Sequence, residues 1–543
     1  MTPLSFALLL TIAIAAGIGV FRAPEIQQAK VGSSNAALAD DKKAVAIAPE
    51  SAYDSQLTQL INQTIDTSDF TTARWGVCVL SLKDGRILYA RNAEGLFTPA
   101  SNMKIYTTAV ALDLLGADYR WRTSVYAESP PDGEGTIKGD LTLYGRGAPD
   151  LTSRSHKDAP ASLGQLADDL YQRGVRHVRG NVIGDESYFR GEPLGDGWQW
   201  NDIQWYFGAE PSALSIDDNE VDVEIKPATE ANDPPIAKLS NEHSDLQITS
   251  EIAIVKSGEQ LAVGIHRGLS DNKVHVWGEF PAGSRGFGAR LSVHDPARLA
   301  ASLFMAALKA RGITIDGEAG TRDFRVPRNQ RFDPSSATEL AYLSSRPLSE
   351  VVRATNKESI NLNAELILRT LGRERGEPES DGDSHKSHER SDDVAGLAVI
   401  RQWLARAGIE TKNLALHDGS GLSRLNLVSP ETSVRLLQAT SKSAAAAIFR
   451  DSLPVAGTDG TLRGRLGSYK DRVFAKTGSL TYDNSLSGFL ITPEGSDLAF
   501  SIMCNDQTGR ASSIRMIDKI VEILAEYSPA KASNNTKTGV FKN

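Results

Sequence analysis

Residues 98–116 read TPASNMKIYTTAVALDLLG, and this stretch decides the fold of the chain. After Ser101 the apolar residues recur at roughly helical spacing, and Gly116 ends the run. Pro99 suits the start of a helix, because the N–H that proline lacks is unpaired there in any residue. The pattern therefore predicts a helix that is apolar on one side and that carries Ser101 in its first turn.

Lys104 follows Ser101 by three positions, so both side chains lie on one face of the predicted helix. A serine hydroxyl is a poor nucleophile until a base takes its proton. A lysine acts as that base only when burial or a second cation lowers its pKa. The free N–H groups of the first turn also suit a developing oxyanion. The S-x-x-K pattern thus indicates an activated serine.

Two further short motifs follow in order, Ser359-Ile360-Asn361 and Lys476-Thr477-Gly478. Lys476 stands in a strand-like run, where its charge could be the second cation that lowers the pKa of Lys104. The sequence also holds decoys of both end motifs. Ser270-Asp271-Asn272-Lys273 lies in a polar turn and Lys537-Thr538-Gly539 in a polar tail, so neither has the helix or strand that would position it.

The rest of the chain predicts an α/β (α+β) domain in two parts, residues 53–121 and 335–527. The first part adds a hairpin over residues 75–92 that turns at Asp84-Gly85. The second adds helical patterns over 348–372, 395–408 and 430–442, and then three strand-like runs within 472–506. Residues 122–334 between the parts alternate like short strands, so we expect a β-rich insert, with a candidate nested subdomain at about 222–287.

The N-terminal segment indicates export. Residues 3–21 carry no charge, so residues 1–25 are a signal peptide or a membrane anchor, and the sequence leaves these two open. Residues 26–52 are a predicted linker and 528–543 a disordered tail. Cys78 and Cys504 both lie in strand-like runs. They are too few for a disulfide framework, which favours two buried thiols.

Composition excludes some classes of function. The net charge of −9 argues against nucleic-acid binding, and 40% apolar with 23% charged residues is typical of a globular protein. The glycine-rich run at 457–464 lacks the G-K-[ST] of a phosphate loop, and His385 and His388 have no ligand framework around them.

The three motifs, in this order, resemble those of the penicillin-recognising serine acyl-transferases. The long insert between the first two motifs is similar to the class C low-molecular-mass penicillin-binding proteins, the penicillin-binding protein 4 type. Further matches are DGSGLSR at 418–424, LPVAGTDG at 453–460 and Trp200-Asn201-Asp202, so the resemblance covers residues from about 55 to 526. It implies a discontinuous penicillin-binding transpeptidase-like domain and a serine D-Ala-D-Ala carboxypeptidase, with DD-endopeptidase activity left open.

The resemblance also implies roles for the motif residues. Ser101 is the nucleophile, Lys104 the general base, Ser359 the proton relay to the leaving amine, and Asn361 a support for the substrate amide and Lys104. The three residues of the third motif and the neighbouring Ser479 belong to the substrate site, where they bind the terminal carboxylate or complete the oxyanion hole: Lys476, Thr477, Gly478 and Ser479.

A pocket for the diaminopimelate side chain of the stem peptide is implied as well. Asp202 of the insert would face the ammonium group and Arg424 the carboxylate, with Phe207 beside them. Thr481 departs from relatives that carry a longer polar residue there, which leaves side-chain affinity in doubt.

No metal or organic cofactor is needed for the implied reaction. The expected partners are peptidoglycan stem peptides ending in D-Ala-D-Ala, with β-lactams as covalent inhibitors, and the expected location is the periplasm, with or without attachment to the inner membrane. Two alternatives from other classes remain, a β-lactamase and a non-catalytic cell-wall binding protein.

Overall fold

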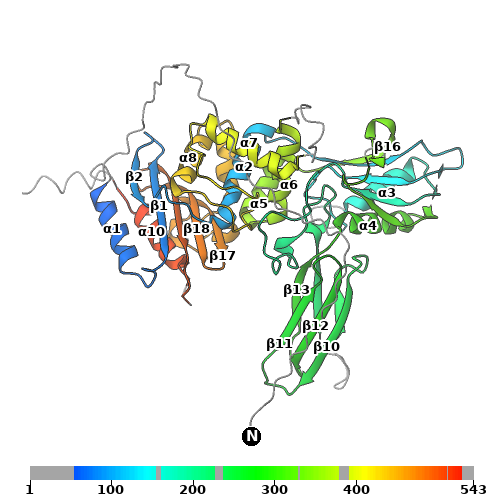
Figure 1. Cartoon of the computed structure of the whole chain (residues 1–543), viewed down its shortest axis with the longest axis horizontal. Helices are drawn as coiled ribbons and strands as arrows, with labels where there is room; N and C mark the ends of the chain where they lie inside the picture. Colours follow the sequence, from blue (N-terminus) through cyan, green and yellow to red (C-terminus); the bar gives the residue numbers. More distant parts are fainter. Residues whose placement is uncertain are drawn as a thin grey trace, which may run out of the picture. The chain divides into compact units, whose positions relative to one another are not determined.

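The computed structural model describes residues 54–153, 161–226, 236–327, 330–377, 390–509 and 512–528, all within one compact unit (Figure 1). The predicted signal or anchor, the linker, the decoy motif at Lys537 and the tail beyond Ser528 lie outside these residues.

A five-stranded antiparallel sheet forms the centre of the predicted peptidase part, with strand order β17-β18-β19-β1-β2. The expected hairpin at Asp84-Gly85 joins the first two strands of the chain. The strands are β1 (Arg74–Ser81), β2 (Ile87–Arg91), β17 (Val473–Leu480), β18 (Asp483–Ile491) and β19 (Asp497–Asn505). The two ends of the chain therefore share one sheet, as the sequence predicts for a discontinuous domain.

Both cysteines lie in neighbouring strands of this sheet. Cys504 pairs with Trp75 in register, and Cys78 pairs with Ser501. Because the two positions are three residues apart along the pair, the thiols point to opposite faces of the sheet. Both cysteines are free and buried, which confirms the expectation of two buried thiols.

Helices cover both faces of the sheet. On one face α1 (Ser55–Asp66) and α10 (Ile514–Ala525) pack together, and on the other α8 (Pro430–Thr440) lies on β1 and β19. Four more helices build the body on the α8 side around α2 (Met103–Leu115): α5 (Leu348–Glu358), α6 (Asn361–Arg375), α7 (Asp392–Arg406) and α9 (Ala446–Ser452).

The central helix α2 departs from the sequence prediction of one apolar side. Every residue from Met103 to Leu112 is buried, including Lys104, Thr107 and Thr108. Helices α5, α6, α7, α8 and α9 all contact it, so this stretch has no face towards solvent. The polar residues are buried because they carry hydrogen bonds: Thr107 Oγ1 donates to the carbonyl of Gly419 at 2.8 Å.

The helical pattern over 348–372 is two helices in the structure. Ser359 takes a left-handed backbone conformation (φ 60°, ψ 39°) that ends α5, and α6 begins at Asn361. The second motif therefore lies at a corner between two helices.

The insert has a core of its own. Its main sheet has the order β15-β7-β5-β3-β16, and α3 and α4 pack together beside it. The elements are β3 (Arg122–Ala127), β5 (Leu141–Tyr144), β7 (Val182–Asp185), β15 (Ala319–Arg322), β16 (Thr338–Ser344), α3 (Ser162–Gln172) and α4 (Pro296–Ala310). A small sheet joins β4 (Thr136–Ile137), β6 (His177–Val178) and β14 (Thr314–Ile315). Because β16 pairs with β3, the sheet of the insert extends to Ser344, past the predicted boundary at 334.

Two three-stranded sheets occupy the region of the candidate nested subdomain. One has the order β13-β8-β9 and the other β10-β12-β11. Their strands are β8 (Glu220–Lys226), β9 (Ile236–Leu239), β10 (Gln247–Val255), β11 (Ala262–Arg267), β12 (Lys273–Pro281) and β13 (Phe287–Ser292). The decoy Ser270 lies in the exposed turn between β11 and β12, as its polar context predicts.

Candidate active site

Ser101 lies in a short 3-10 turn, η2 (Ala100–Asn102), that runs directly into α2. The side chain of Asn102 donates to Ser485 Oγ, which in turn donates to the carbonyl of Pro99 at 2.6 Å. These bonds fix the turn against strand β18. Ser101 lies between these two anchored residues, Pro99 and Asn102, as the sequence predicts for a serine at the start of a helix.

Lys104 is fully buried, and its ammonium nitrogen has three partners. It lies 3.0 Å from Ser101 Oγ, 2.6 Å from Asn361 Oδ1 and 2.7 Å from the carbonyl oxygen of Ser420. Burial lowers the pKa of Lys104 to about 7, against the opposing effect of two buried acids, Asp418 and Glu365. At neutral pH a large fraction of Lys104 is thus neutral and able to accept the proton of Ser101.

Ser359 and Asn361 reach the same centre from the corner between α5 and α6. Ser359 Oγ accepts a hydrogen bond of 2.9 Å from Lys476 Nζ. Asn361 Oδ1 accepts from Lys104, and Asn361 Nδ2 donates to the carbonyl of Phe207 in the insert at 2.8 Å. The two motifs therefore meet at Ser101, and Asn361 also holds the insert against the site.

Lys476 is the second buried cation of the site. Its ammonium group donates to Ser359 Oγ and to the carbonyl of Thr477, and burial together with the charge on Lys104 holds its pKa well below its ordinary value. From the sequence, we expected the charge of Lys476 to lower the pKa of Lys104. Burial is the main cause at Lys104, and the repulsion between the two cations acts on Lys476.

The third motif lies on β17, beside the turn that carries Ser101. Thr477 Oγ1 donates to Thr461 Oγ1 at 2.8 Å, and Ser479 Oγ donates to Asn484 Oδ1 at 3.0 Å. A Cβ on Gly478 would lie 2.6 Å from the carbonyl of Pro99 and closer still to Ser485 Oγ. Glycine at this position thus lets β17 approach the Ser101 turn.

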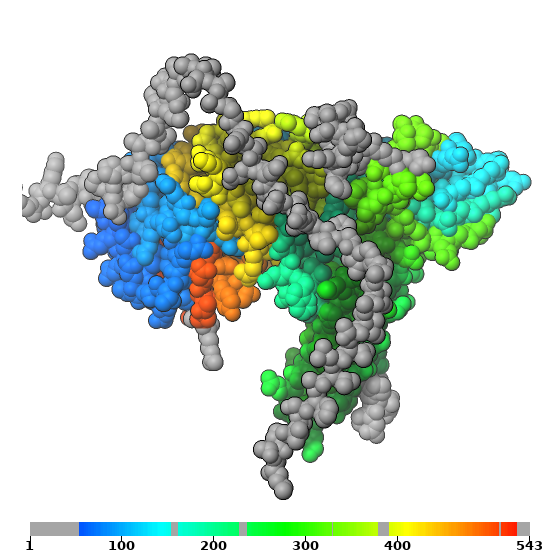
Figure 2. Space-filling view, viewed as in Figure 1, coloured from blue at the N-terminus to red at the C-terminus, as the bar shows by residue number. Residues whose placement is uncertain are grey.

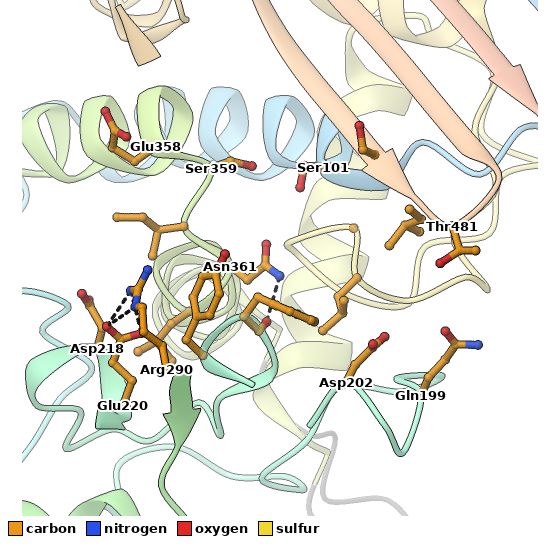
Figure 3. Close-up of a pocket in the computed structure, with 18 of the residues that line it drawn as sticks. Ser101, Gln199, Asp202, Asp218, Glu220, Arg290, Glu358, Ser359, Asn361 and Thr481 are labelled. Carbon is orange, nitrogen blue, oxygen red and sulfur yellow. Dashed lines mark hydrogen bonds and ion pairs between the residues drawn. The ribbon is translucent and has the colours of Figure 1, made fainter. Parts of the chain in front are cut away.

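A pocket of about 640 Å³ opens beside Ser101, and residues from both the peptidase part and the insert line it (Figure 3). Figure 2 shows the teal and green surface of the insert beside the yellow and orange surface of the peptidase part. Figure 3 shows the two ends of the pocket on either side of Asn361. Asp202, Gln199 and Thr481 lie at one end. Glu358, Asp218, Glu220 and Arg290 lie at the other.

The three predicted side-chain pocket residues, Asp202, Phe207 and Arg424, all line this cavity. Burial raises the pKa of the Asp202 carboxyl, and the positive charge of Arg424 opposes that rise. The Arg424 guanidinium already donates to Asp483 Oδ2 at 2.8 Å and to the carbonyl of Thr481 at 2.9 Å. These bonds fix Arg424 beside Asp202.

Sequence reasoning missed the acids beneath Lys104. Glu365 Oε1 accepts from the backbone N–H of Ser420 at 2.8 Å, and Asp418 Oδ1 accepts from that of Gly421. These bonds aim the Ser420 carbonyl at Lys104. Glu365 lies four residues after Asn361 on α6, a spacing that places both on one helix face and could have indicated it.

The far end of the pocket was missed as well. Arg290 of β13 pairs with both carboxylate oxygens of Glu220, and its guanidinium lies over the Tyr206 ring, 4.0 Å from the centroid. No local motif marks these residues, because strand pairing between β8 and β13 brings them together. Among the described residues, no group of His, Cys, Asp or Glu side chains is arranged to hold a metal ion.

Comparison with known protein families matches residues 57–527 to the D-Ala-D-Ala carboxypeptidase 3 (S13) family. The chain belongs to this family. It is 34% identical over 503 residues to the D-alanyl-D-alanine carboxypeptidase of Actinomadura sp. (strain R39), a match that spans 90% of this chain and 88% of the relative. It is 27% identical over 452 residues to D-alanyl-D-alanine carboxypeptidase DacB of Haemophilus influenzae, over 80% of this chain and 87% of the relative.

A solved structure agrees with this S13 assignment. The crystal structure of penicillin binding protein 4 from Haemophilus influenzae superposes with a TM-score of 0.71 at 25% identity, over 86% of this chain and 99% of that chain. The predicted fold class, a penicillin-binding transpeptidase-like domain with a large insert, is confirmed. The chain is a serine-type D-Ala-D-Ala carboxypeptidase.

Proposed function

We propose that this S13 carboxypeptidase releases the terminal D-Ala of peptidoglycan stem peptides through an ester on Ser101. The contact that supports this most directly is the 3.0 Å separation of Ser101 Oγ from the amine of the fully buried Lys104. Ser101 Oγ attacks the carbonyl carbon of the penultimate D-Ala, and its proton passes to Lys104. The negative charge that develops on the carbonyl oxygen is stabilised by the backbone N–H groups of Ser101 and Ser479.

The leaving amine then needs a proton. The proton that Lys104 took from Ser101 passes to Ser359 Oγ, while Ser359 gives its own proton to the nitrogen as the C–N bond breaks, so Lys104 is neutral again. Lys476 and Asn361 hold Ser359 and Lys104 in place for this transfer. Water next adds to the ester carbon and loses a proton to Lys104, which returns that proton to Ser101 Oγ as the ester bond breaks. A β-lactam amide enters the same first step, but its amine stays tethered to the acyl group.

The terminal carboxylate of the substrate fits the β17 wall. Lys476 supplies a buried positive charge, and Thr477 and Ser479 supply hydroxyl groups, while Gly478 keeps the strand close. These groups suit one carboxylate at a fixed distance from Ser101.

The Asp202 end of the pocket suits the zwitterionic side chain of a diamino acid. Asp202 offers a carboxylate for the ammonium group and Arg424 a guanidinium for the carboxylate, and Phe207 lines the same cavity. Asp202→Asn is expected to raise KM at least about fivefold for a diaminopimelate peptide, since an ion pair is lost, and to leave KM for an alanine-substituted peptide unchanged.

We place the enzyme outside the inner membrane, because its substrate is there and because residues 3–21 suit export. Whether the N-terminal segment is cleaved or retained as an anchor stays a prediction on residues outside the described ranges. Within those ranges no helix is long and apolar enough to cross a membrane.

The decisive experiment is intact-mass spectrometry after incubation with benzylpenicillin. The wild-type chain is expected to gain one penicilloyl group, and Ser101→Ala to gain none. Ser270→Ala is the matched control, since it removes the serine of the exposed decoy motif and should label as wild type does. An adduct on Ser101→Ala, or none on wild type, would contradict the proposal.

The lifetime of the adduct separates this function from a β-lactamase. A carboxypeptidase is expected to keep the adduct for many minutes, because the amine of the opened β-lactam stays tethered to the acyl group and hinders attack by water. Turnover of penicillin faster than turnover of a D-Ala-D-Ala peptide would instead favour the β-lactamase, and a chain inert to both would be a non-catalytic binding protein.

A further inference from the structure

Three large apolar side chains stand exposed around the Asp202 end of the pocket. Trp200 is 67% exposed, Tyr482 55% and Leu425 46%, and the first two are the most exposed large apolar side chains in the described part of the chain. We refer to Trp200, Leu425 and Tyr482 as the aromatic rim. Contiguous exposed apolar groups usually mark a binding surface.

The rim comes from three chain segments that Arg424 ties together. Arg424 donates to the carbonyl of Thr481, next to Tyr482, and lies 3.5 Å from Gln199 Oε1, next to Trp200. Leu425 follows Arg424 and lies against the same loop, since a Cβ on Gly197 would be 2.6 Å from Leu425 Cδ1. The rim is therefore continuous with the substrate pocket, which Gln199, Thr481 and Arg424 line.

Two rim positions hold an aromatic residue where packing does not require it. Tyr482 has φ 72° in the two-residue turn between β17 and β18, a conformation that costs a residue with a Cβ about 1–2 kcal/mol relative to glycine. Among the described residues, the Trp200 ring makes no ring–ring or cation–π contact and its N–H has no hydrogen-bond partner. Both rings are free to present a flat face to a ligand.

The orientation of the bound peptide brings the part of the substrate beyond the acyl group to the rim. The leaving amine must lie near Ser359, at the Glu358 end of the pocket, so the acyl part extends toward Asp202 and Thr481 (Figure 3). The acyl chain is the stem peptide, whose other end is attached to the glycan strand. A few extended residues at about 3.5 Å each carry the chain from Ser101 to the pocket edge and beyond.

We propose that the aromatic rim binds an N-acetylated hexosamine of the glycan strand that carries the stem peptide. This inference rests on the proposed function. The C–H face of a sugar ring stacks on an aromatic face, and the acetyl methyl group suits Leu425. Arg424, beside the rim, is paired with Asp483, and the Asp202 carboxylate lines the pocket next to it, so these groups offer a neutral sugar polar partners but give little attraction to an anionic lipid surface.

The test compares two substrates on the full-length chain, a free pentapeptide and the same pentapeptide on its N-acetylglucosaminyl-N-acetylmuramyl disaccharide. The readout is the ratio of their kcat/KM values. We expect wild type to favour the disaccharide form about tenfold, as stacking on two rings suggests, and Trp200→Ala and Tyr482→Ala each to lower the ratio about threefold. Trp277→Ala is the matched control, because Trp277 is also exposed but lies on β12, outside the pocket lining.

Each outcome decides between the two proposals. A wild-type chain that hydrolyses neither substrate contradicts the proposed function. Equal kcat/KM values for the two substrates contradict glycan binding at the rim. So does a kcat/KM ratio that falls as far in Trp277→Ala as in the rim variants. A second assay measures binding to vesicles of phosphatidylethanolamine and phosphatidylglycerol: loss of vesicle binding in Trp200→Ala with an unchanged ratio would make the rim a membrane contact and overturn the glycan assignment.

Discussion

The proposed reactivity of Ser101 depends on one buried amine. Lys104 is a base only in its neutral form, and its pKa of about 7 follows from burial among Asn361, Ser420 and the helices around α2. A lysine on the surface would keep a pKa near 10.5 and be protonated at neutral pH. Burial thus turns an ordinary residue into a base suited to physiological conditions.

We expect the rate of penicilloyl-adduct formation to rise with pH through an apparent pKa of about 7. The sign follows because protonated Lys104, present below this pKa, cannot accept the Ser101 proton, so the rate at pH 5 should be roughly a hundredfold below the plateau. Quenched-flow mixing followed by mass spectrometry measures this rate. Lys104→Arg should lower the rate of adduct formation at least about a thousandfold, since a guanidinium stays protonated. Lys273→Arg in the decoy motif should react at the wild-type rate. A flat profile would exclude Lys104 as the base.

At the scale of single residues, the sequence predicted the contacts that depend on local spacing. Ser101 and Lys104 are three positions apart on one helix, and the structure brings them within hydrogen-bond distance. The buried acid Glu365 and the carbonyl of Ser420 come from other elements and act through tertiary contacts, which no spacing around Ser101 encodes.

At the scale of elements, the corner at Ser359 and the loop at Gly421 line the pocket opposite β17. The apolar pattern runs on across residues 348–372, and neither glycine nor proline marks Ser359, so sequence alone predicted one helix. The left-handed turn at Ser359 is held by contacts from outside: Lys476 donates to its hydroxyl group, and Asn361 bonds Lys104 and the insert. Tertiary structure here overrides local preference.

Gly421 presses the 418–424 loop against the nucleophile turn. It has φ 84°, and a Cβ there would lie 1.8 Å from the carbonyl oxygen of Ala100. Gly421→Ala should therefore destabilise the fold by more than about 2 kcal/mol and slow acylation at least about tenfold, because Ala100 must move with Ser101. Gly408→Ala is the matched control: φ is 74°, but no atom lies within 4 Å of the added Cβ. Urea unfolding and acylation rates measure both, and equal effects of the two variants would contradict the clash.

At the scale of the whole molecule, the peptidase part and the insert each have their own hydrophobic core, and the site lies where they meet. The insert supplies Asp202 and Phe207 through one loop. That loop is bonded to Asn361 on one side and, through Ile203, to the nested sheets on the other. Sequence texture located the insert, but the pairing of β16 with β3, which extends its sheet to Ser344, depends on a strand far along the chain.

Arg267 is the residue that joins the nested sheets to the pocket loop. It is 1% exposed and donates to the carbonyls of Ile203, Gly268 and Asp271. Arg267→Met fills similar volume but leaves these carbonyls without their donor, which should destabilise the chain by about 2–4 kcal/mol. Since Ile203 follows Asp202, KM for a diaminopimelate peptide should rise more than kcat falls.

The control for Arg267 is Arg298→Met in the same insert. Arg298 forms an exposed ion pair with Asp245, 2.9 Å long, and its loss should change stability by less than about 0.5 kcal/mol. Urea unfolding followed by steady-state kinetics at a temperature where both variants are folded separates the effects. If Arg267→Met lowers stability but leaves KM unchanged for every peptide, the nested sheets support the fold alone. If KM rises only for peptides with the charged side chain, they also set the position of Asp202.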